Sequence, residues 1–205
     1  SRGTPTTRTV TSVADTYRGD RFIRPNDLAL DTAGGVYFTD PRLGKSDKPQ
    51  DKEAFYYVAA DGNVTRLGDD LRYPNGILLS PDEKTLYVLP FMGTELMAYD
   101  VLSPGKLGDA RVLYQMPARE DGRRGGGDGL TVDAEGNLYL TAPVVKAIVV
   151  IDPDGNELGR IPVPKAPTNC AFGGPGFKTL YITARETVYA VPMEARGHVV
   201  CRPDL

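Results

Sequence analysis

The sequence has little histidine and cysteine, the residues on which many hydrolytic and metal sites depend. Among 205 residues there is one histidine, His198, and there are two cysteines, Cys170 and Cys201. A Ser-His-Asp triad, a Cys-His dyad or a histidine-rich metal site is therefore hard to build. Two cysteines also argue against a disulfide framework or a thiolate zinc site, and two free thiols are favoured over a single bridge. Any chemistry must rest on Asp, Glu, Asn, Arg or a bound ion.

The chain also lacks long hydrophobic runs and a large net charge. No apolar run is long enough to span a bilayer, so we expect no membrane partner. The formal net charge of −3, from 24 Lys+Arg and 27 Asp+Glu, argues against nucleic acid as the main partner. No basic segment followed by an apolar stretch marks a signal peptide. The compartment stays open: the cytoplasm or, if a leader lies upstream, the periplasm or the cell exterior.

What the chain does have is a succession of short apolar stretches separated by turns. Its 23 glycines and 17 prolines are spread along the whole length, as in a protein with many turns. For example, Ile77–Leu79 and Leu86–Leu89 flank a turn, and so do Leu130–Val132 and Leu138–Leu140. β-branched and aromatic residues dominate these stretches, and none shows a helical period over three turns. The sequence therefore predicts an all-β fold of antiparallel hairpins.

The pattern repeats four times along the chain. Each unit opens with a polar residue just before an apolar strand, at Asn26, Asn75, Asp128 and Asn169, with spacings of 49, 53 and 41 residues. A unit of about 40 to 50 residues with four strands is the sequence form of a β-propeller blade. We therefore predict about four blades, with residues 9–14 as the last strand of a blade that precedes them.

The repeat also predicts a site. The first strand of each blade runs beside the central channel, so Asn26, Asn75, Asp128 and Asn169 should surround one axis at the same height. Oxygen donors that converge in this way suit Ca²⁺, Mg²⁺ or Mn²⁺. The alternative is that these residues only satisfy turn backbone groups at the strand starts. The residues alone leave both readings open.

Two other stretches are interpreted as ordinary connections. Residues 123–127, Arg-Arg-Gly-Gly-Gly, are not followed by the residues of a phosphate-binding loop, and we expect them to deliver Asp128 to the channel. Residues 133–137 have some of the residues of a calcium loop but not the spacing of an EF-hand, so we expect a hairpin turn there.

At these openings the sequence resembles the SMP-30/gluconolactonase/regucalcin-like family and, more distantly, the diisopropyl-fluorophosphatase propellers. The matching stretches cover nearly all of the chain in the order of the family, and together they are highly specific. They are residues 24–28 (RPNDL), 37–41 (YFTDP), 73–77 (YPNGI), 80–88 (SPDEKTLYV), 127–130 (GDGL) and 169–174 (NCAFGG).

The resemblance implies a six-bladed propeller that holds one divalent cation and hydrolyses lactones, typically sugar lactones such as gluconolactone. Ca²⁺ is the favoured ion, with Mg²⁺, Mn²⁺ and Zn²⁺ as alternatives. Asn26, Asn75 and Asp128 match metal ligands, and Asp128 is also the expected catalytic base. Arg24, Asn26 and Asp40 match substrate-binding positions, Asp40 more weakly than the others. Asn169 matches a position that lines the channel.

The sequence departs from the family in one respect. The first blade of the family opens with a metal-ligating Glu in a Glu-Gly-Pro context, and this chain has no such motif. We therefore expect residues 1–205 to be a single but partial propeller domain, which lacks the N-terminal blade and most of the second. Exposed blade edges could associate with that missing segment or with other chains.

Two further functions compete with the metal-dependent lactonase. One is a non-catalytic propeller that serves as a binding scaffold, because propellers host many unrelated roles. The other is a propeller that hydrolyses organophosphates. The three polar openings in register favour an enzyme, and the missing Glu favours a scaffold.

Overall fold

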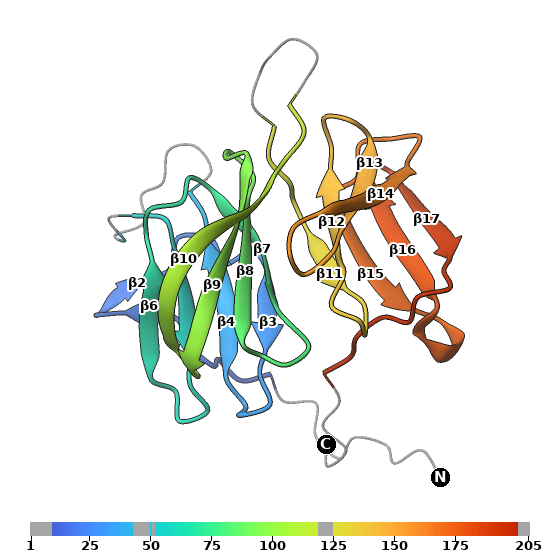
Figure 1. The fold of residues 1–205 in the computed structure, drawn as a ribbon. Helices are drawn as coiled ribbons and strands as arrows, with labels where there is room; N and C mark the ends of the chain where they lie inside the picture. The colour runs from blue at the N-terminus through green and yellow to red at the C-terminus, as the bar shows by residue number, and fades with distance from the viewer. Residues whose placement is uncertain (1–9, 43–49, 51, 119–124, 201–205) are drawn as a thin grey trace.

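The computed structural model describes residues 10–42, 50, 52–118 and 125–200 of the chain. Four antiparallel sheets follow one another along the sequence, after a short hairpin of two strands (Figure 1). The hairpin and the first sheet consist of β1 (Thr16–Tyr17), β2 (Asp20–Arg21), β3 (Leu28–Leu30), β4 (Val36–Asp40), β5 (Ala54–Val58) and β6 (Val64–Gly68). The second sheet consists of β7 (Pro74–Leu79), β8 (Thr85–Pro90), β9 (Glu95–Ser103) and β10 (Lys106–Gln115). The third and fourth sheets consist of β11 (Leu130–Val132), β12 (Leu138–Ala142), β13 (Ala147–Ile151), β14 (Glu157–Pro162), β15 (Asn169–Gly173), β16 (Thr179–Ala184) and β17 (Thr187–Pro192), with a 3₁₀ turn η1 (Pro175–Phe177).

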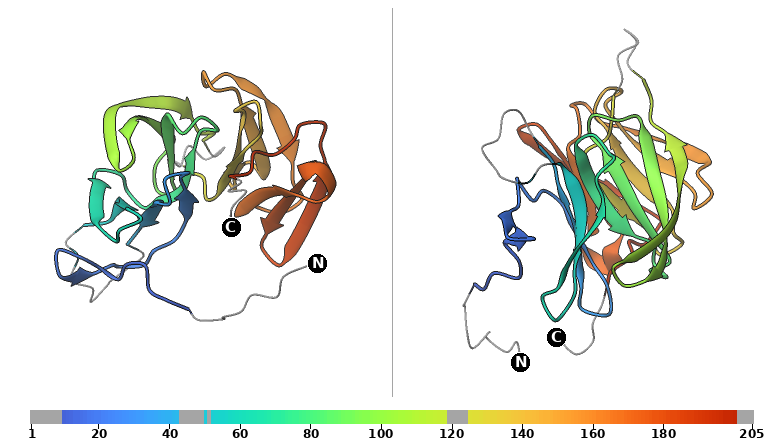
Figure 2. Two further views of the ribbon diagram at one scale, coloured as in Figure 1. Left: turned by 90° about the horizontal axis from the view of Figure 1, so that it is seen from below. Right: turned by 90° about the vertical axis from the view of Figure 1, so that its left-hand side faces the viewer.

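Each sheet is a meander in which neighbouring strands are consecutive in the chain, as in a propeller blade. The sheets are arranged around a common axis, with the first strand of each next to the first strand of the following one (Figure 2). We call the sheets blades 1 to 4 and the strands β3, β7, β11 and β15 the inner strands. This arrangement confirms the predicted all-β propeller with four blades. Blade 4 has three strands within the described residues.

One predicted strand is wrong. Residues 10–14, the described part of the strand expected at 9–14, form no strand, and the side chain of Val10 is 97% exposed. A strand needs a partner for its backbone groups, and no described strand pairs with this segment. No helix in the described part of the chain is both long and apolar enough to cross a bilayer.

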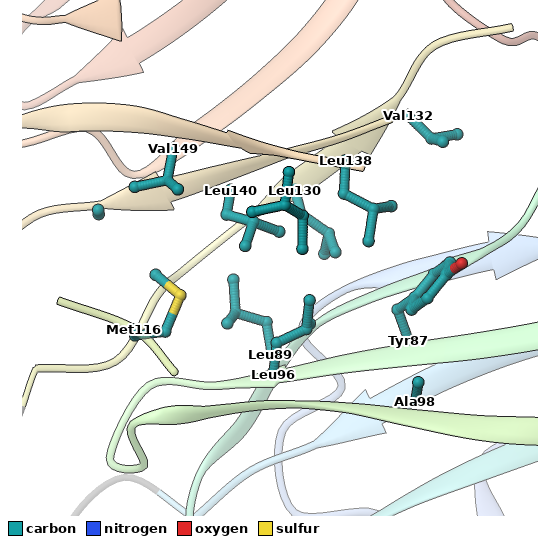
Figure 3. Packing of buried hydrophobic residues seen from close by; sticks show 12 residues of the cluster. Tyr87, Leu89, Leu96, Ala98, Met116, Leu130, Val132, Leu138, Leu140 and Val149 are labelled. Carbon is teal, nitrogen blue, oxygen red and sulfur yellow. The ribbon is translucent and has the colours of Figure 1, made fainter. Parts of the chain in front are cut away.

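The core lies between the blades, because alternate residues of each strand face opposite neighbours. On β8, Leu86 and Val88 pack toward blade 1, whereas Tyr87 and Leu89 pack toward blade 3. Figure 3 shows the second of these interfaces, in which Leu89 faces leucines of blade 3. A third cluster joins blade 3 to blade 4. The inner strands of blades 2 and 3 are thus held in place by apolar packing on both faces.

The outer faces of the first and last blades differ from the interfaces between blades. Leu28 and Leu30 on β3 are 59% and 50% exposed, and Tyr181 and Val188 of blade 4 are 42% and 67% exposed. These residues point away from the neighbouring blade, where a propeller would place a further sheet. Association through these faces remains a prediction.

Candidate functional site

The four predicted openings lie at the same end of the inner strands. Asn75 lies in β7 and Asn169 begins β15, while Asn26 and Asp128 precede β3 and β11 by two residues. Adjacent inner strands contact one another, so these openings form a row of neighbours around the axis. The repeat therefore predicted their common location.

Asn75 and Asp128 are in direct contact. Asn75 is buried, and a hydrogen bond from its side chain to the Asp128 carboxylate lowers the pKa of that carboxyl. Burial has the larger effect and raises the pKa of Asp128 to about 6, with a further increase from the negative charge of Asp27. Because removal from water disfavours the charged form, Asp128 holds its proton to a higher pH than an exposed aspartate does. Such a group can both bind a cation and accept a proton.

Asp27 is a residue of the site that was not predicted from the sequence. Its Oδ1 accepts a hydrogen bond from the backbone of Leu28 at 2.9 Å, and its Oδ2 accepts one from Ile77 of the next blade at 3.3 Å. Burial raises the pKa of this carboxyl above its usual range, although both hydrogen bonds lower it. Asp27 therefore ties blade 1 to blade 2 beside Asn75.

Threonines on the second strand of blades 1 and 3 hold these openings in place. The Oγ1 of Thr39 accepts from the Asp27 N–H at 3.2 Å and donates to the Asn75 carbonyl at 2.7 Å. The Oγ1 of Thr141 accepts from the Asp128 N–H at 2.9 Å and donates to the Gly129 carbonyl at 2.8 Å. Both hydroxyls are fully buried, so each bond forms away from water.

A repeated motif in the sequence marks the positions of these threonines. Tyr-x-Thr recurs at residues 37–39, 139–141 and 181–183, in the second strand of three of the four blades. In blade 4 the Thr183 hydroxyl lies 3.0 Å from that of Thr168 and is exposed. Only the structure shows that these hydroxyls bind the backbone of the opening residues.

Two glycines let the openings approach one another. A Cβ added to Gly76 would lie 2.5 Å from the Asp128 carbonyl oxygen, which is backbone and cannot move aside. A Cβ added to Gly129 would overlap the amide of Asn169. The Asn169 side chain therefore lies against the residue that follows Asp128, although it is exposed and its Oδ1 accepts from the Cys170 N–H.

The predicted substrate-binding residues of blade 1 have different surroundings. Arg24 and Asn26 are exposed at the mouth of the channel, where a ligand could reach them. Asp40 is fully buried, and its carboxylate accepts from the Ile23 N–H at 2.9 Å and from the Arg24 N–H at 2.5 Å. Asp40 thus positions the segment that carries Arg24. A direct role of Asp40 in substrate binding remains a prediction, as do the roles of Arg24 and Asn26.

Carboxylates at the opposite end of the inner strands belong to turns. Asp133 accepts from the backbone of Glu135 at 3.0 Å and of Asn137 at 2.9 Å, and from the Tyr139 hydroxyl at 3.1 Å. In blade 1, Asp31 accepts from Gly35 and from a tyrosine hydroxyl in a similar way. Residues 133–137 therefore form the predicted hairpin turn.

Cys170 is buried and unpaired beneath Asn169, and burial raises the pKa of its thiol to about 12. Its partner in the alternative of a single bridge, Cys201, lies outside the described residues, as do Arg123 and Arg124 of the glycine-rich stretch. The thiol therefore contributes packing and no reactivity.

The donors at the mouth suit a hard divalent cation. No group of three or more His, Cys, Asp and Glu side chains gathers to hold a metal within the described residues. The available set is the Asp128 carboxylate with the amides of Asn75, Asn26 and Asn169, and a half-turn of the Asn75 amide would present its oxygen. Oxygen donors with one carboxylate fit Ca²⁺ or Mg²⁺ better than Zn²⁺, because soft or imidazole ligands are missing from the set.

Comparison with known families shows to which family the chain belongs. Residues 2–186 match the family described as the SMP-30/Gluconolactonase/LRE-like region. The chain belongs to this family. A gluconolactonase from Zymomonas mobilis is 37% identical over 206 residues, which cover 94% of this chain and 57% of the relative.

Solved structures agree with this membership. A gluconolactonase from Xanthomonas campestris is 32% identical with a TM-score of 0.75, over 87% of this chain and 60% of that one. A regucalcin from Agrobacterium tumefaciens, described as a calcium-binding protein, is 27% identical with a TM-score of 0.69, over 88% of this chain and 63% of that one. The chain thus spans about three-fifths of the length of these SMP-30/gluconolactonase relatives.

Proposed function

We propose that the mouth formed by Asn26, Asn75 and Asp128 hydrolyses a lactone, typically a sugar lactone, with the help of one divalent cation. The observation that carries the proposal is the contact between Asn75 and the desolvated carboxylate of Asp128. Relatives named as gluconolactonases support lactone hydrolysis as the activity. The relative described as calcium-binding supports Ca²⁺ as the ion.

Each residue of the site has a separate role in the proposed reaction. Asp128, with its pKa of about 6, is mostly ionised at pH 7 and remains basic enough to accept a proton. Asn75 and Asn26 supply neutral oxygens, which would hold a cation without cancelling its charge. A cation bound there would supply Lewis acidity at the lactone carbonyl. Arg24 offers several donors to substrate hydroxyls.

In the hydrolysis, one C–O bond forms, one C–O bond breaks, and one proton passes from the water to the leaving oxygen. Water loses a proton to the Asp128 carboxylate while its oxygen forms a bond to the carbonyl carbon. The ring C–O bond then breaks, and the leaving oxygen takes this proton from Asp128 to become a hydroxyl, which restores the carboxylate. Thr141 holds the backbone of Asp128 during this cycle, and Asn75 holds its carboxylate.

The proposal is tested by the hydrolysis of glucono-1,5-lactone, followed through acid release with a pH indicator. We expect turnover that EDTA abolishes and added Ca²⁺ restores. Asp128→Asn should remove it, whereas Asp152→Asn, in an exposed turn at the far end of blade 3, should not. Turnover in the Asp128 variant equal to wild type would remove Asp128 from its role. No turnover above buffer at millimolar Ca²⁺ would favour the non-catalytic scaffold.

A further inference from the structure

A second pocket opens at the same end of the molecule as Asp128. Its volume is about 290 Å³, and its walls come from blades 2, 3 and 4. Phe91 follows β8, Val144 follows β12 and Arg185 follows β16, while Gly125 and Gly126 precede Asp128. Each of these second strands ends where the inner strand of its blade begins, because the two are antiparallel. The pocket is therefore at the mouth and not at the far end.

The pocket neighbours the candidate site through two segments of the chain. Gly126 is two residues before Asp128, so the two Cα atoms lie within about 8 Å of each other. Phe91 donates its N–H to the Tyr73 carbonyl at 2.9 Å, and the rings of the two residues are 5.5 Å apart. Tyr73 is in turn two residues before Asn75. A molecule bound at Asn75 and Asp128 can thus extend into the pocket.

Within the described part of the chain, the lining is mostly apolar and carries a single charged side chain. Phe91, Val144 and three further apolar side chains line it together with the two glycines, and Arg185 is the only ionisable residue among them. Arg185 is exposed, and within the described residues it forms no ion pair. Its neighbour Glu186 is instead paired with Lys165. The charge of Arg185 lowers the pKa of Glu186 less than the hydrogen bond from Lys165 does, so the guanidinium of Arg185 remains available to a ligand.

A guanidinium beside apolar walls selects for a particular chemical group. Its planar set of donors matches the two oxygens of a carboxylate or the oxygens of a phosphate. The apolar walls limit the access of water on one side of the exposed guanidinium, which strengthens the attraction between the charges modestly. A neutral hydroxyl would bind to the guanidinium much more weakly.

We propose that this pocket is a subsite for an anionic substituent of the substrate lactone, with Arg185 as its partner. The substituent is a carboxylate or a phosphate at the end of the molecule remote from the ring carbonyl. The inference rests on the proposed lactonase activity and assigns the substrate of that site to the acidic lactones.

The test compares kcat/KM for three lactones with loaded enzyme in Ca²⁺. Glucono-1,5-lactone is neutral, glucaro-1,4-lactone carries a carboxylate, and 6-phosphoglucono-1,5-lactone carries a phosphate. We expect at least one acidic lactone to be preferred, and Arg185→Gln to lower its kcat/KM by about 10- to 100-fold while changing the neutral lactone less than twofold. The acidic lactone with the larger loss identifies carboxylate or phosphate as the substituent.

Three further variants separate charge from packing. Arg185→Lys should keep part of the preference, because it keeps the charge without the planar donors. Val144→Asp should abolish the preference, because it places a like charge in the subsite. Arg111→Gln removes an arginine that pairs with Asp100 on blade 2, away from the pocket, and should change nothing.

A binding measurement provides a readout that does not depend on turnover. Calorimetric titration with 6-phosphogluconate, glucarate and gluconate should show tighter binding of a doubly charged acid, lost in Arg185→Gln. If the neutral lactone is opened but Arg185→Gln alters neither the acidic lactones nor acid binding, the subsite is wrong and the lactonase proposal stands. If wild type opens none of the three lactones, the proposed function fails, and this inference fails with it.

Discussion

Asp128 at the mouth and the turn aspartates at the far end of the inner strands have opposite surroundings. At the far end, Asp31 and Asp133 are buried, and their carboxylates accept hydrogen bonds from backbone N–H groups and a tyrosine hydroxyl. At the mouth, Asp128 has one side-chain donor, Asn75, and burial raises its pKa to about 6. A carboxylate whose two oxygens accept hydrogen bonds from the turn stabilises that turn. A carboxylate that is desolvated with few donors costs stability and is available for a cation or a proton.

The largest effect expected from this comparison is on catalysis. Asp128→Asn should lower kcat/KM for the lactone by about 10³-fold, because it removes both the base and the anionic ligand. The midpoint of thermal unfolding, measured by circular dichroism without added cation, should stay equal or rise, because a desolvated charge is removed. A large fall in this midpoint would show that Asp128 is mainly structural.

The far end should respond in the opposite way. Asp133→Ala should lower the free energy of unfolding by about 3 kcal/mol, because buried N–H and hydroxyl donors lose their acceptor. Activity per folded molecule should be unchanged. Asp152→Ala is the matched control, since this aspartate is partly exposed and accepts from the equivalent backbone N–H groups of its turn. If Asp133→Ala removed activity without unfolding the chain, the assignment of functions to the two ends would be wrong.

The pH dependence sharpens the same contrast. Without a bound cation the pKa of Asp128 is raised to about 6, so protons should compete with Ca²⁺ for this carboxylate, and activity at subsaturating Ca²⁺ should fall as the pH drops below 6. The folded state also holds this proton more tightly than the unfolded chain does. Between pH 4 and 6 without cation, Asp128 should therefore make stability decrease as pH rises. The pH profile of denaturant unfolding for wild type and Asp128→Asn checks the sign, and identical profiles would contradict it.

The threonine contacts should give the smallest effect. Thr141→Val leaves the Asp128 N–H without its acceptor, while the Gly129 carbonyl keeps only the Thr141 N–H, which we expect to cost about 1 to 2 kcal/mol and to reduce kcat several-fold. Thr141→Ser keeps the hydroxyl and should restore both. Thr183→Val, at the exposed equivalent in blade 4, should have a weaker effect on both quantities. Equal losses in the Ser and Val variants would assign Thr141 to packing alone.

The comparison also explains how much could be predicted from the sequence. The four blades and the common location of Asn26, Asn75, Asp128 and Asn169 were predictable, because a repeat places equivalent residues at equivalent corners. The strand at residues 9–14 was wrongly predicted, because an apolar alternation does not reveal whether a partner strand is present.

The parts of the site that the sequence did not predict depend on contacts between blades. Asp27 reaches Ile77, and Thr39 reaches the carbonyl of Asn75, across 50 and 36 residues of sequence. The close approach of Gly76 to Asp128 is likewise a property of two neighbouring blades. Local patterns predict where a strand begins but not which backbone group of the next blade lies against it.

The most direct test of the account is calorimetric titration of Ca²⁺ into the purified protein at pH 7.5. We predict binding of one ion per chain that Asp128→Asn and Asn75→Ala each weaken by tenfold or more, and that weakens in wild type as pH falls below 6. Binding that both variants leave unchanged, or no binding at millimolar Ca²⁺, would contradict the claim that the openings of neighbouring blades form one cation site.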